Sequence, residues 1–319
     1  MSQEFNLNNF NALSKREKLK VRADSLQAIR SFFHQKEVIE VDTFLLGSGV
    51  IVDEHIDLMR VDKKSKTPRF LLSSPESGMK QLLCQGSGDI FQLAHVYRKE
   101  EQGANHSPVF TMLEWYKTGT DFKNFLEDNF AILALFTQKQ NHLITSYSDA
   151  FKRYARVDCT ASHTEFEKVL TRANIDCSNL KNTHLESLVW SMLIEPKLGR
   201  SGFEVIVDYP KSQSALAQIH MEKGKEVAKR FEIYFQGKEL ANGYLELQES
   251  CTYKKRMDAQ NMNRKNSGKE TYPIDLSLIK ALKENPLPAC YGIAIGFDRL
   301  LMLKTGQTHI SSVLPLPLQ

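Results

Sequence analysis

The fold of this chain is decided by two stretches, Phe91-Gln-Leu-Ala-His-Val-Tyr-Arg-Lys-Glu-Glu101 and Pro108-Val-Phe-Thr-Met-Leu-Glu-Trp-Tyr116. Apolar and polar residues alternate in both, which is the period expected of half-buried strands. The polar segment between them contains Gly103 and Asn105. The two stretches therefore predict an antiparallel hairpin with a long loop.

The two arms of this hairpin each present a set of side chains on one face, because residues two apart in a strand point the same way. The first arm groups Ala94, Val96 and Arg98, and the second groups Phe110, Met112, Glu114 and Tyr116. The pattern predicts an arginine at the mouth of the loop and an acid beside a phenol on the sheet. Taken alone, it also fits a surface hairpin with a solvated loop.

The composition is that of an ordinary globular protein. Of 319 residues, 41% are hydrophobic and 25% are charged, which allows a large core. The net charge of +4 neither requires nor excludes nucleic acid. The five scattered cysteines contain no C-x-x-C pair and predict neither a disulfide framework nor a zinc site. No run is long and apolar enough for a membrane span, so we expect a cytoplasmic protein with no membrane partner.

The expected domain organisation is a short leader followed by one domain. Residues 1–14 predict an N-terminal leader, and residues 15–319 predict the domain. Within it, apolar residues at every third or fourth position predict an amphipathic helix over 15–37, and residues 40–46 predict a strand. Residues 149–201 predict a mainly helical insertion.

Ser74-Pro75-Glu76 marks a helix start that has two interpretations. Ser at an N-cap and Pro at the first helical position signal a helix, which is expected to end near Gly86. Capping alone accounts for Ser74 and Glu76. The alternative is a helix start beside a cleft, where the carboxylate of Glu76 faces a ligand amine.

A second predicted hairpin carries three acids. If Gln236-Gly237 is a two-residue turn, Glu232 and Glu239 become diagonal neighbours on one face, roughly 7–8 Å apart. That spacing suits two carboxylates that hold Mg²⁺ between them and a polyphosphate. A bulge at Asn242-Gly243 would return Glu246 to the same face. Solvated strand glutamates are the alternative, which the apolar neighbours of these acids disfavour.

The C-terminal part adds basic residues. Thr252 to Lys265 predicts a polar helix whose lysines and arginines form either a solvated face or a docking patch for an acidic partner. Tyr291 to Gly296 predicts a buried strand that leads directly into a helix. Arg299 falls in the first turn of that helix, where backbone N–H groups already favour an anion.

Together these stretches resemble the three signature motifs of class II aminoacyl-tRNA synthetases, in the right order. The helix and strand ending at Leu46 look like motif 1, Val96 to Glu100 with Phe110 looks like motif 2, and Gly292 to Leu301 looks like motif 3. The resemblance covers residues 15–315. It implies an α+β fold in which a mostly antiparallel sheet is flanked by helices.

Within that class the chain is similar to lysyl-tRNA synthetases. The stretches that carry this similarity are Ser74-Pro-Glu76, Phe110-Thr-Met-Leu-Glu-Trp-Tyr116, Glu239-Leu-Ala-Asn-Gly-Tyr-Leu-Glu246 and Gly296-Phe-Asp-Arg299. Motif 1 begins near residue 20, which leaves no room for the OB-fold anticodon-binding domain of the bacterial synthetases. The chain therefore resembles the lysyl-tRNA-synthetase paralogues that attach (R)-β-lysine to elongation factor P. Ala294 agrees, because those synthetases generally have Gly there and a methyl group would narrow the amino-acid pocket.

The resemblance implies a role for each matching residue. As catalytic residues it implies Arg98 at the α-phosphate of ATP and Arg299 at the γ-phosphate. The rest of the implied nucleotide site is Lys99, Glu100 at the adenine amino group, Ser107, Phe110 stacked on the ring, Glu239, Leu240 and Gly296. The implied lysine site is Glu246 and Tyr116 at the ε-ammonium, Ser74, Glu76 and Glu114 around the other amine, and Ala294. The implied ligands of Mg²⁺ are Glu232 and Glu239.

Three positions depart from the family pattern. Ser107 stands where an ATP-contacting Asn is usual, Val109 where Glu is usual, and Phe44 where motif 1 has a proline. The first two bear on ATP binding and the third on the dimer interface. The remaining phosphate and amino-acid positions are intact, so we expect an active enzyme.

The resulting expectation is an AMP-forming, ATP-dependent ligase. It would activate (R)-β-lysine as an adenylate and transfer it to the ε-amine of a lysine on elongation factor P, as a homodimer formed through motif 1 and without tRNA as a partner. Two alternatives stay open: a minimal lysyl-tRNA synthetase, and a non-catalytic synthetase-derived binding module. The sequence also leaves open whether α-lysine or β-lysine is preferred.

Overall fold

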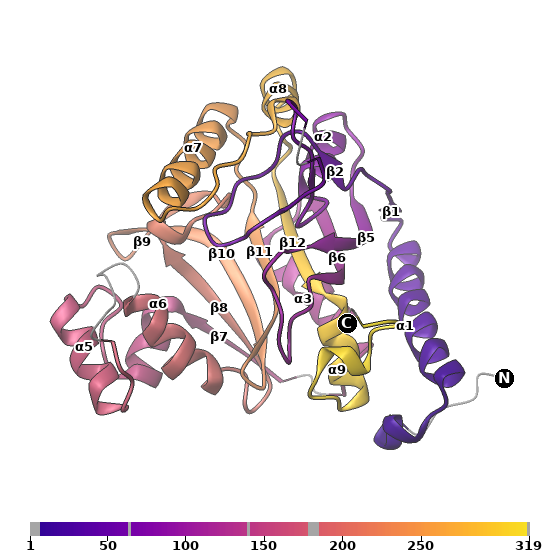
Figure 1. Cartoon of the computed structure of the whole chain (residues 1–319), viewed down its shortest axis with the longest axis horizontal. Helices are drawn as coiled ribbons and strands as arrows, with labels where there is room; N and C mark the ends of the chain where they lie inside the picture. The colour runs from indigo at the N-terminus through magenta and orange to yellow at the C-terminus, as the bar shows by residue number, and fades with distance from the viewer. Residues whose placement is uncertain (1–6, 63–64, 139–140, 178–184, 318–319) are drawn as a thin grey trace. The chain divides into compact units, whose positions relative to one another are not determined.

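The computed structural model describes residues 7–62, 65–138, 141–177 and 185–317 (Figure 1). The chain divides into two compact units, one formed by Met1–Gln138 with Leu245–Gln319 and the other by Lys139–Tyr244. The predicted insertion over 149–201 lies inside the second unit, and its described residues form mostly helices.

The sheet of the first unit is built on the predicted hairpin, which is confirmed. Strand β5 (Ile90–Tyr97) pairs antiparallel with β6 (Val109–Thr118), and Ala94 lies opposite Met112. On the other side of β6 the pairing with β12 (Cys290–Gly296) is also antiparallel. The short β1 (Ile39–Glu40) adds a parallel edge to β5.

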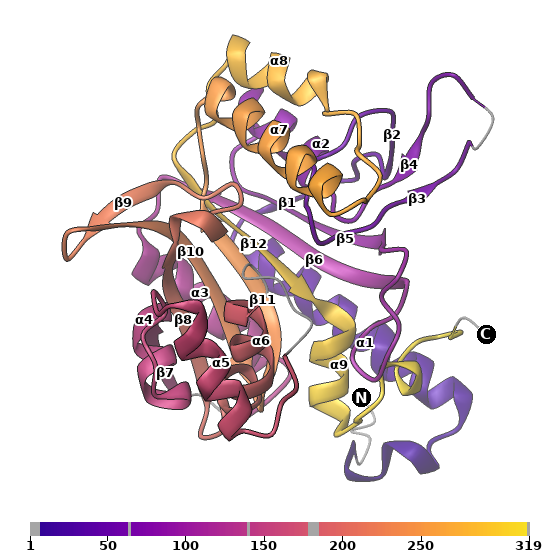
Figure 2. The ribbon, with the colours of Figure 1, turned by 60° about the vertical axis from the view of Figure 1, so that its left-hand side comes forward.

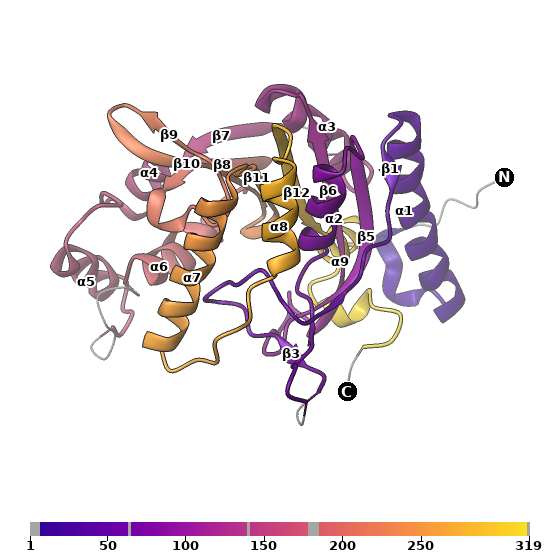
Figure 3. The same cartoon turned by 90° about the horizontal axis from the view of Figure 1, so that it is seen from above.

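Six helices surround this sheet in the described part of the first unit. They are α1 (Lys15–Gln35), α2 (Glu76–Cys84), α3 (Phe122–Ala134), α7 (Ser250–Asn266), α8 (Leu276–Glu284) and α9 (Phe297–Thr305). Figure 2 shows α2, α7 and α8 grouped on one side of the hairpin, and Figure 3 shows α1 on the side of β5 away from α8.

One face of the sheet is an aromatic core beneath α1 and α3. Phe33 of α1 stacks on Phe91 with ring centroids 4.2 Å apart, and Trp115 stacks on Phe125 of α3 at 4.6 Å. Trp115 also donates a hydrogen bond to Asn129. Because side chains alternate along each strand, Glu114 and Tyr116 point to the opposite face, toward α2 and α7.

The N-terminal part of this unit contains a short helix that buries one aromatic side chain. Residues 1–6 of the predicted leader lie outside the described residues. Leu7–Ala12 forms the 3-10 helix η1, and the side chain of Phe10 is only 2% exposed. Ser14 then caps α1 and exchanges hydrogen bonds with Glu17 in a capping box.

Two local predictions for this unit are wrong. Residues 40–46 do not form one strand; β1 ends at Glu40, and β2 (Leu46–Gly47) belongs to a separate sheet with β4 (Phe70–Leu71) and β3 (Met59–Arg60). After β1 the backbone passes to a different sheet, because Leu46 and Gly47 pair with β4 there. Helix α2 begins one residue later than predicted, with Pro75 in the cap position. Ser74 Oγ still accepts a hydrogen bond from the N–H of Glu76, at 3.4 Å.

The second unit is a sheet with helices of its own. Its strands run in the order β11 (Lys238–Leu245), β10 (Lys225–Phe235), β8 (Phe203–Pro210) and β7 (His142–Ser146), and β9 (Ile219–Glu222) pairs with β10. The helical segments are α4 (Tyr147–Ala150), η2 (Phe151–Ala155), α5 (His163–Arg172), α6 (Leu185–Val189), η4 (Trp190–Ile194), η5 (Glu195–Lys197) and η6 (Lys211–Gln213). Its aromatic core includes Tyr147 stacked on Trp190 at 4.6 Å.

The predicted second hairpin exists, but its bulge lies elsewhere. Tyr234 pairs with Glu239 as predicted, and Glu232 pairs with Asn242. Leu240 is therefore the extra residue in β11, and it is buried. The prediction of a bulge at Asn242-Gly243 is wrong, because both residues hold regular pairs in the ladder.

The fold class predicted from the sequence is confirmed. Only the pairs β1–β5 and β7–β8 are parallel among the pairings described above, and helices flank the strands of both units. The architecture is α+β with a mostly antiparallel sheet. Among the described residues, no helix has the length and apolar character needed to cross a membrane.

Candidate active site

A ladder of cross-strand pairs arranges the predicted site residues along one face of the first unit's sheet. Tyr116 lies opposite Gly292, Glu114 opposite Ala294, and Met112 opposite Gly296. Residues directly opposite each other share a face. The seven residues from Phe110 to Tyr116 span about 20 Å at the rise of an antiparallel strand. The ladder therefore orders the predicted amine-binding residues at one end and the predicted nucleotide residues at the other.

The amine end is a buried polar cluster, which we call the amino-acid pocket. It consists of Glu76, Lys80, Glu114, Tyr116, Glu246 and Tyr253. Tyr116 donates a 2.5 Å hydrogen bond to Glu114, whose side chain has 3% of its surface exposed. Burial, followed by the charge of Glu76, raises the pKa of Glu114 to about 8. Burial also raises the pKa of Glu246 to about 7, although Lys80 lowers it.

The sequence did not indicate Tyr253 of this pocket as functional, nor did it indicate Lys80. Its side chain is 0% exposed, and its ammonium contacts Glu76, Glu246 at 2.6 Å and Tyr253 at 2.7 Å. The only local signal was the spacing of Glu76 and Lys80, an i, i+4 pair on a helix. Such pairs are usually solvated.

Gly292 is required by the close packing of the pocket. A Cβ atom at this position would lie 2.4 Å from Glu246 Oε1 and 2.4 Å from a ring carbon of Tyr116. No real side chain tolerates such contacts, so only glycine lets both groups approach the strand. Ser74 lies just before α2, where its hydroxyl bonds the backbone of Glu76, a capping contact.

The other end of the ladder carries the predicted phosphate-binding arginines. Arg98 lies over the ring of Phe110 at 5.1 Å and pairs with Glu101 at 3.0 Å. Arg299 contacts His106 Nε2 at 2.7 Å and donates to the carbonyl of Asn105. Glu101 and His106 are partners that sequence reasoning did not assign.

The charges of both arginines act on the pKa of His106. Its pKa is lowered by burial first and then by Arg299 and Arg98, while Glu101 raises it. Both arginines contact the loop between β5 and β6, Arg98 through Glu101 and Arg299 through His106. A neutral imidazole can accept the hydrogen bond from Arg299.

The remaining predicted nucleotide residues of this unit differ in exposure. Lys99 and Glu100 have 60% and 70% of their side-chain surface exposed. Ser107 is buried, and Gly296 is the N-cap of α9. Lys99 and Glu100 are therefore accessible to a ligand, whereas Ser107 is packed against other residues of this chain.

A buried ion pair fixes the helix that carries Arg299. Asp298 accepts from Arg22 of α1 at 2.5 Å and from the backbone N–H of Thr111 at 2.6 Å. Arg22 also donates to the Thr111 hydroxyl at 2.7 Å. These contacts connect α1, β6 and α9. They thus join the three segments that resemble motifs 1, 2 and 3.

The predicted metal ligands lie in the second unit. Glu232 and Glu239 share a face, because Glu239 pairs with Tyr234, two residues from Glu232. The two oxygens of Glu232 already accept from Tyr209 at 2.5 Å, from Tyr234 and from Arg230. Glu232 as it stands does not fit a metal ligand, since a cation would have to displace one of these donors. Within the described residues, no group of three or more His, Cys, Asp or Glu is placed to hold a metal ion.

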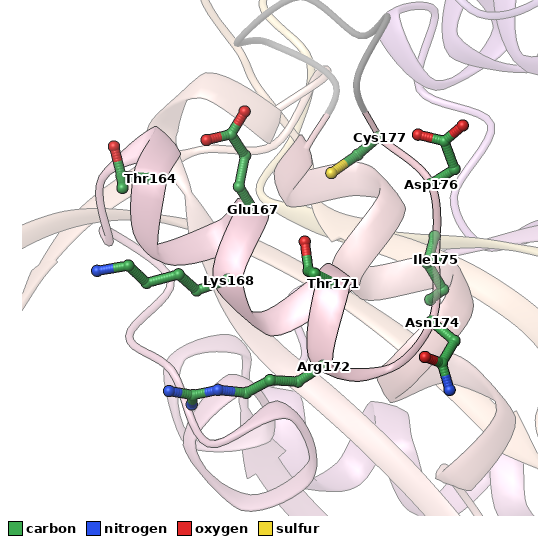
Figure 4. A pocket seen from close by; sticks show the side chains of 9 residues that line it. All are labelled: Thr164, Glu167, Lys168, Thr171, Arg172, Asn174, Ile175, Asp176 and Cys177. Carbon is green, nitrogen blue, oxygen red and sulfur yellow. The ribbon is translucent and has the colours of Figure 1, made fainter.

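The second unit also contains a cavity of about 820 Å³. It is lined by α5 and the segment that follows it, from Thr164 to Cys177 (Figure 4). None of the predicted site residues lines it. Its lining residues are mixed in charge and do not form a recognisable catalytic group.

Comparison with known proteins gives the class of this molecule. The family model of class II tRNA synthetases (D, K and N) matches residues 5–319. The chain belongs to this family.

Within the family, the chain is similar to a particular group of ligases. It is 37% identical to a protein of Vibrio cholerae serotype O1 over 94% of both chains, and 38% identical to one of Photobacterium profundum over 94% of this chain and 95% of the relative. A protein of Hamiltonella defensa is 35% identical over 93% and 94%. All three carry the name elongation factor P–(R)-β-lysine ligase.

Proposed function

We propose that this protein uses ATP to activate (R)-β-lysine as an adenylate and transfers the β-lysyl group to the ε-amine of a lysine on elongation factor P. The observation that carries the proposal is the amino-acid pocket, in which the buried carboxylates of Glu114 and Glu246 and the half-buried carboxylate of Glu76 lie on the face that also leads to Arg98 and Arg299. The names of the similar proteins supply the substrate.

The pocket suits a molecule with two ammonium groups. Buried carboxylates are costly unless they are paired, so Glu114 and Glu246, with the half-buried Glu76 beside them, call for cations. Charge-assisted hydrogen bonds to an ammonium contribute about 1.5–3 kcal/mol each. Ala294 lies opposite Glu114, and its methyl group narrows the space beside this acid.

In the first step a carboxylate oxygen of lysine attacks the α-phosphorus of ATP. A P–O bond forms, the bond to the bridging oxygen breaks, and pyrophosphate leaves with the electron pair. Two anions must meet, so the barrier falls when positive charge lies at the phosphates. Arg98 and Arg299 supply that charge once ATP displaces Glu101 and His106. No general base is needed, because the nucleophile is already ionised.

In the second step the ε-amine of the protein lysine attacks the carbonyl carbon of the adenylate. A C–N bond forms, the C–O bond to the phosphate breaks, and AMP leaves. The amine nitrogen loses a proton to solvent. The product is an amide between β-lysine and elongation factor P.

Mg²⁺ is a further expectation of the proposal. Glu239 is half-buried in β11, on the same face as Glu232. A bound Mg²⁺ would neutralise charge on the polyphosphate. The steps above use only the residues of this chain.

The proposal is tested by the intact mass of elongation factor P after incubation with the protein, ATP and either lysine isomer. We expect the mass of one lysyl group to be added, with (R)-β-lysine preferred, and pyrophosphate exchange that depends on the same isomer. Glu246→Gln is expected to abolish both, whereas Glu127→Gln on the exposed face of α3 leaves them unchanged. The absence of exchange with both isomers contradicts the proposal. Charging of tRNA in place of elongation factor P would instead support the minimal synthetase.

A further inference from the structure

The ammonium of Lys80 is enclosed by groups of this chain. A lysine ammonium has three N–H donors, and three groups surround it: Glu76, Glu246 at 2.6 Å and Tyr253 at 2.7 Å. These groups come from α2, from the segment after β11 and from α7. Lys80 can therefore act on a substrate only through the carboxylates that it holds.

The side chain is also fully enclosed. Lys80 is 0% exposed, and its ammonium lies 5.9 Å from the ring of Tyr116 and 5.3 Å from that of Tyr253. Aromatic faces at these distances stabilise a cation. The neighbouring acids more than offset the cost of its burial, so the pKa of Lys80 lies well above its usual value.

The charge of the pocket depends on this one cation. When all three carboxylates are ionised, they carry −3 without Lys80 and −2 with it. Glu114, whose pKa is raised to about 8, reaches this state at neutral pH by losing its proton when an ammonium binds beside it. A diamine acid such as (R)-β-lysine brings two ammonium groups, so a pocket of −2 matches their +2.

We propose that Lys80 is a positioning residue that keeps Glu246 ionised and holds the carboxylates of Glu246 and Glu76 in a fixed direction, so that the pocket balances the two ammonium groups of its substrate. This inference rests on the proposed function for the identity of the diamine. It goes beyond that function, because it assigns the selection of substrate charge to a residue that does not touch the substrate.

The titratable groups near Lys80 determine whether the pKa of Glu246 rises or falls when Lys80 is replaced. Those that face it are Glu76 and Cys84 of α2, Glu114 and Tyr116 of β6, Glu246, Tyr253 of α7 and Cys290 of β12. Burial raises the pKa of Glu246 to about 7 even though Lys80 lowers it. Without the ammonium this pKa rises further, and Glu246 is protonated at neutral pH.

The central test compares Lys80→Met and Lys80→Arg with the unchanged protein in pyrophosphate exchange. At pH 7, Lys80→Met should raise KM for (R)-β-lysine about tenfold or more and leave KM for ATP within about twofold. The rise of kcat/KM with pH should move upward by about one pH unit, which corresponds to that tenfold change. Lys80→Arg keeps the charge and should recover part of the loss. Lys255→Met, on the exposed face of α7, is the matched control.

The outcomes that overturn the inference are specific. A purely structural role would raise KM for both substrates together, or lower kcat alone, without moving the pH profile. An unchanged KM for lysine in a folded Lys80→Met protein would also overturn it. If Lys80→Met does not fold, the Lys80→Arg and Tyr253→Phe proteins decide: both must alter KM for lysine and not KM for ATP.

A second measurement needs no substrate and separates this inference from the proposed function. Infrared difference spectra at pH 7 report protonated carboxyl groups directly. Lys80→Met should gain a protonated carboxyl band relative to the unchanged protein, and Lys80→Met combined with Glu246→Gln should lose it. If exchange fails with every lysine isomer, the proposed function fails, and the presence or absence of this band still decides the role of Lys80.

Discussion

Ala294 and Glu114 form the pair in which a single methyl group bears on substrate choice. They lie directly opposite each other on β12 and β6 and share one face. Ala294 is half-buried beside the small cluster of Ala94, Val96 and Met112. A glycine at position 294 would leave space next to the carboxylate of Glu114.

The first prediction concerns this methyl group. Ala294→Gly should raise kcat/KM for α-lysine relative to (R)-β-lysine by about tenfold, because one methylene in a pocket is worth about 1–3 kcal/mol. Pyrophosphate exchange with each isomer measures the ratio. Ala94→Gly removes a methyl from the same sheet and should leave the ratio unchanged. An equal change in both variants would contradict the assignment of Ala294.

The second prediction concerns pH. With a pKa of about 8, Glu114 is mostly protonated at neutral pH, and an ammonium prefers its ionised form. Deprotonation of Glu114 therefore becomes less costly as pH rises. We expect kcat/KM for (R)-β-lysine to increase between about pH 6 and pH 9.

Two variants identify the group whose titration causes this increase in kcat/KM. Glu114→Gln should remove the part of the rise near pH 8, because the side chain no longer titrates. Tyr116→Phe should move that part to higher pH, because the Tyr116 hydroxyl lowers the pKa of Glu114. A rise that is identical in all three proteins would show that another group titrates.

At the scale of elements, α7 shows that a basic helix can serve packing as well as solvation. Lys254 pairs with Asp258 on the surface, as expected of a solvated helix face. Arg264 points inward instead: its side chain is 0% exposed and its guanidinium lies over the ring of Tyr272 at 4.2 Å. It donates to the carbonyls of residues 53, 56 and 270 and to the carboxylate of Asp57. Arg264 therefore fixes α7 to the segment before β3.

The third prediction follows from these contacts. Arg264→Met should lower the free energy of unfolding by about 3–5 kcal/mol, because it leaves buried acceptors and Asp57 without their cation. Lys265→Met, one residue further along the same helix and exposed, should change it by less than about 0.5 kcal/mol. Denaturant unfolding of both variants makes the comparison. Equal stability of the two would mean that water replaces the guanidinium.

At the scale of the whole molecule, the segment that resembles motif 1 exposes apolar side chains. Ile39, Phe44 and Leu46 have 55%, 48% and 38% of their surface exposed. Neighbouring exposed apolar residues are typical of interaction surfaces. A second copy of the chain is the partner that the family resemblance implies.

The fourth prediction tests this interface. The protein should elute as a homodimer in light-scattering chromatography, and Phe44→Asp should raise the dissociation constant at least about tenfold, because a carboxylate would be buried without a partner. Val61→Asp changes another exposed apolar residue, outside the motif, and should leave the dimer intact. A monomeric unchanged protein contradicts the prediction.

The sequence by itself determined the elements that depend on short-range pattern. Alternation along residues 91–101 and 108–116 gave the hairpin and its facing residues, since a period of two permits only one choice of face. The order of the motifs predicted the α+β fold class and the family. The glycine strand before Arg299 predicted β12 and α9 correctly.

Only the tertiary structure decided which charged residues lie inside. Lys80 and Tyr253 are 173 positions apart, and Arg264 reaches carbonyls more than 200 positions away. Tyr209, which donates to Glu232, comes from another strand 23 positions away. Local pattern reports which face of an element is apolar, whereas the partner of a buried charge comes from another element. Its identity is fixed only when the elements pack, because a buried ion is stable only where a partner and its hydrogen bonds are already in place.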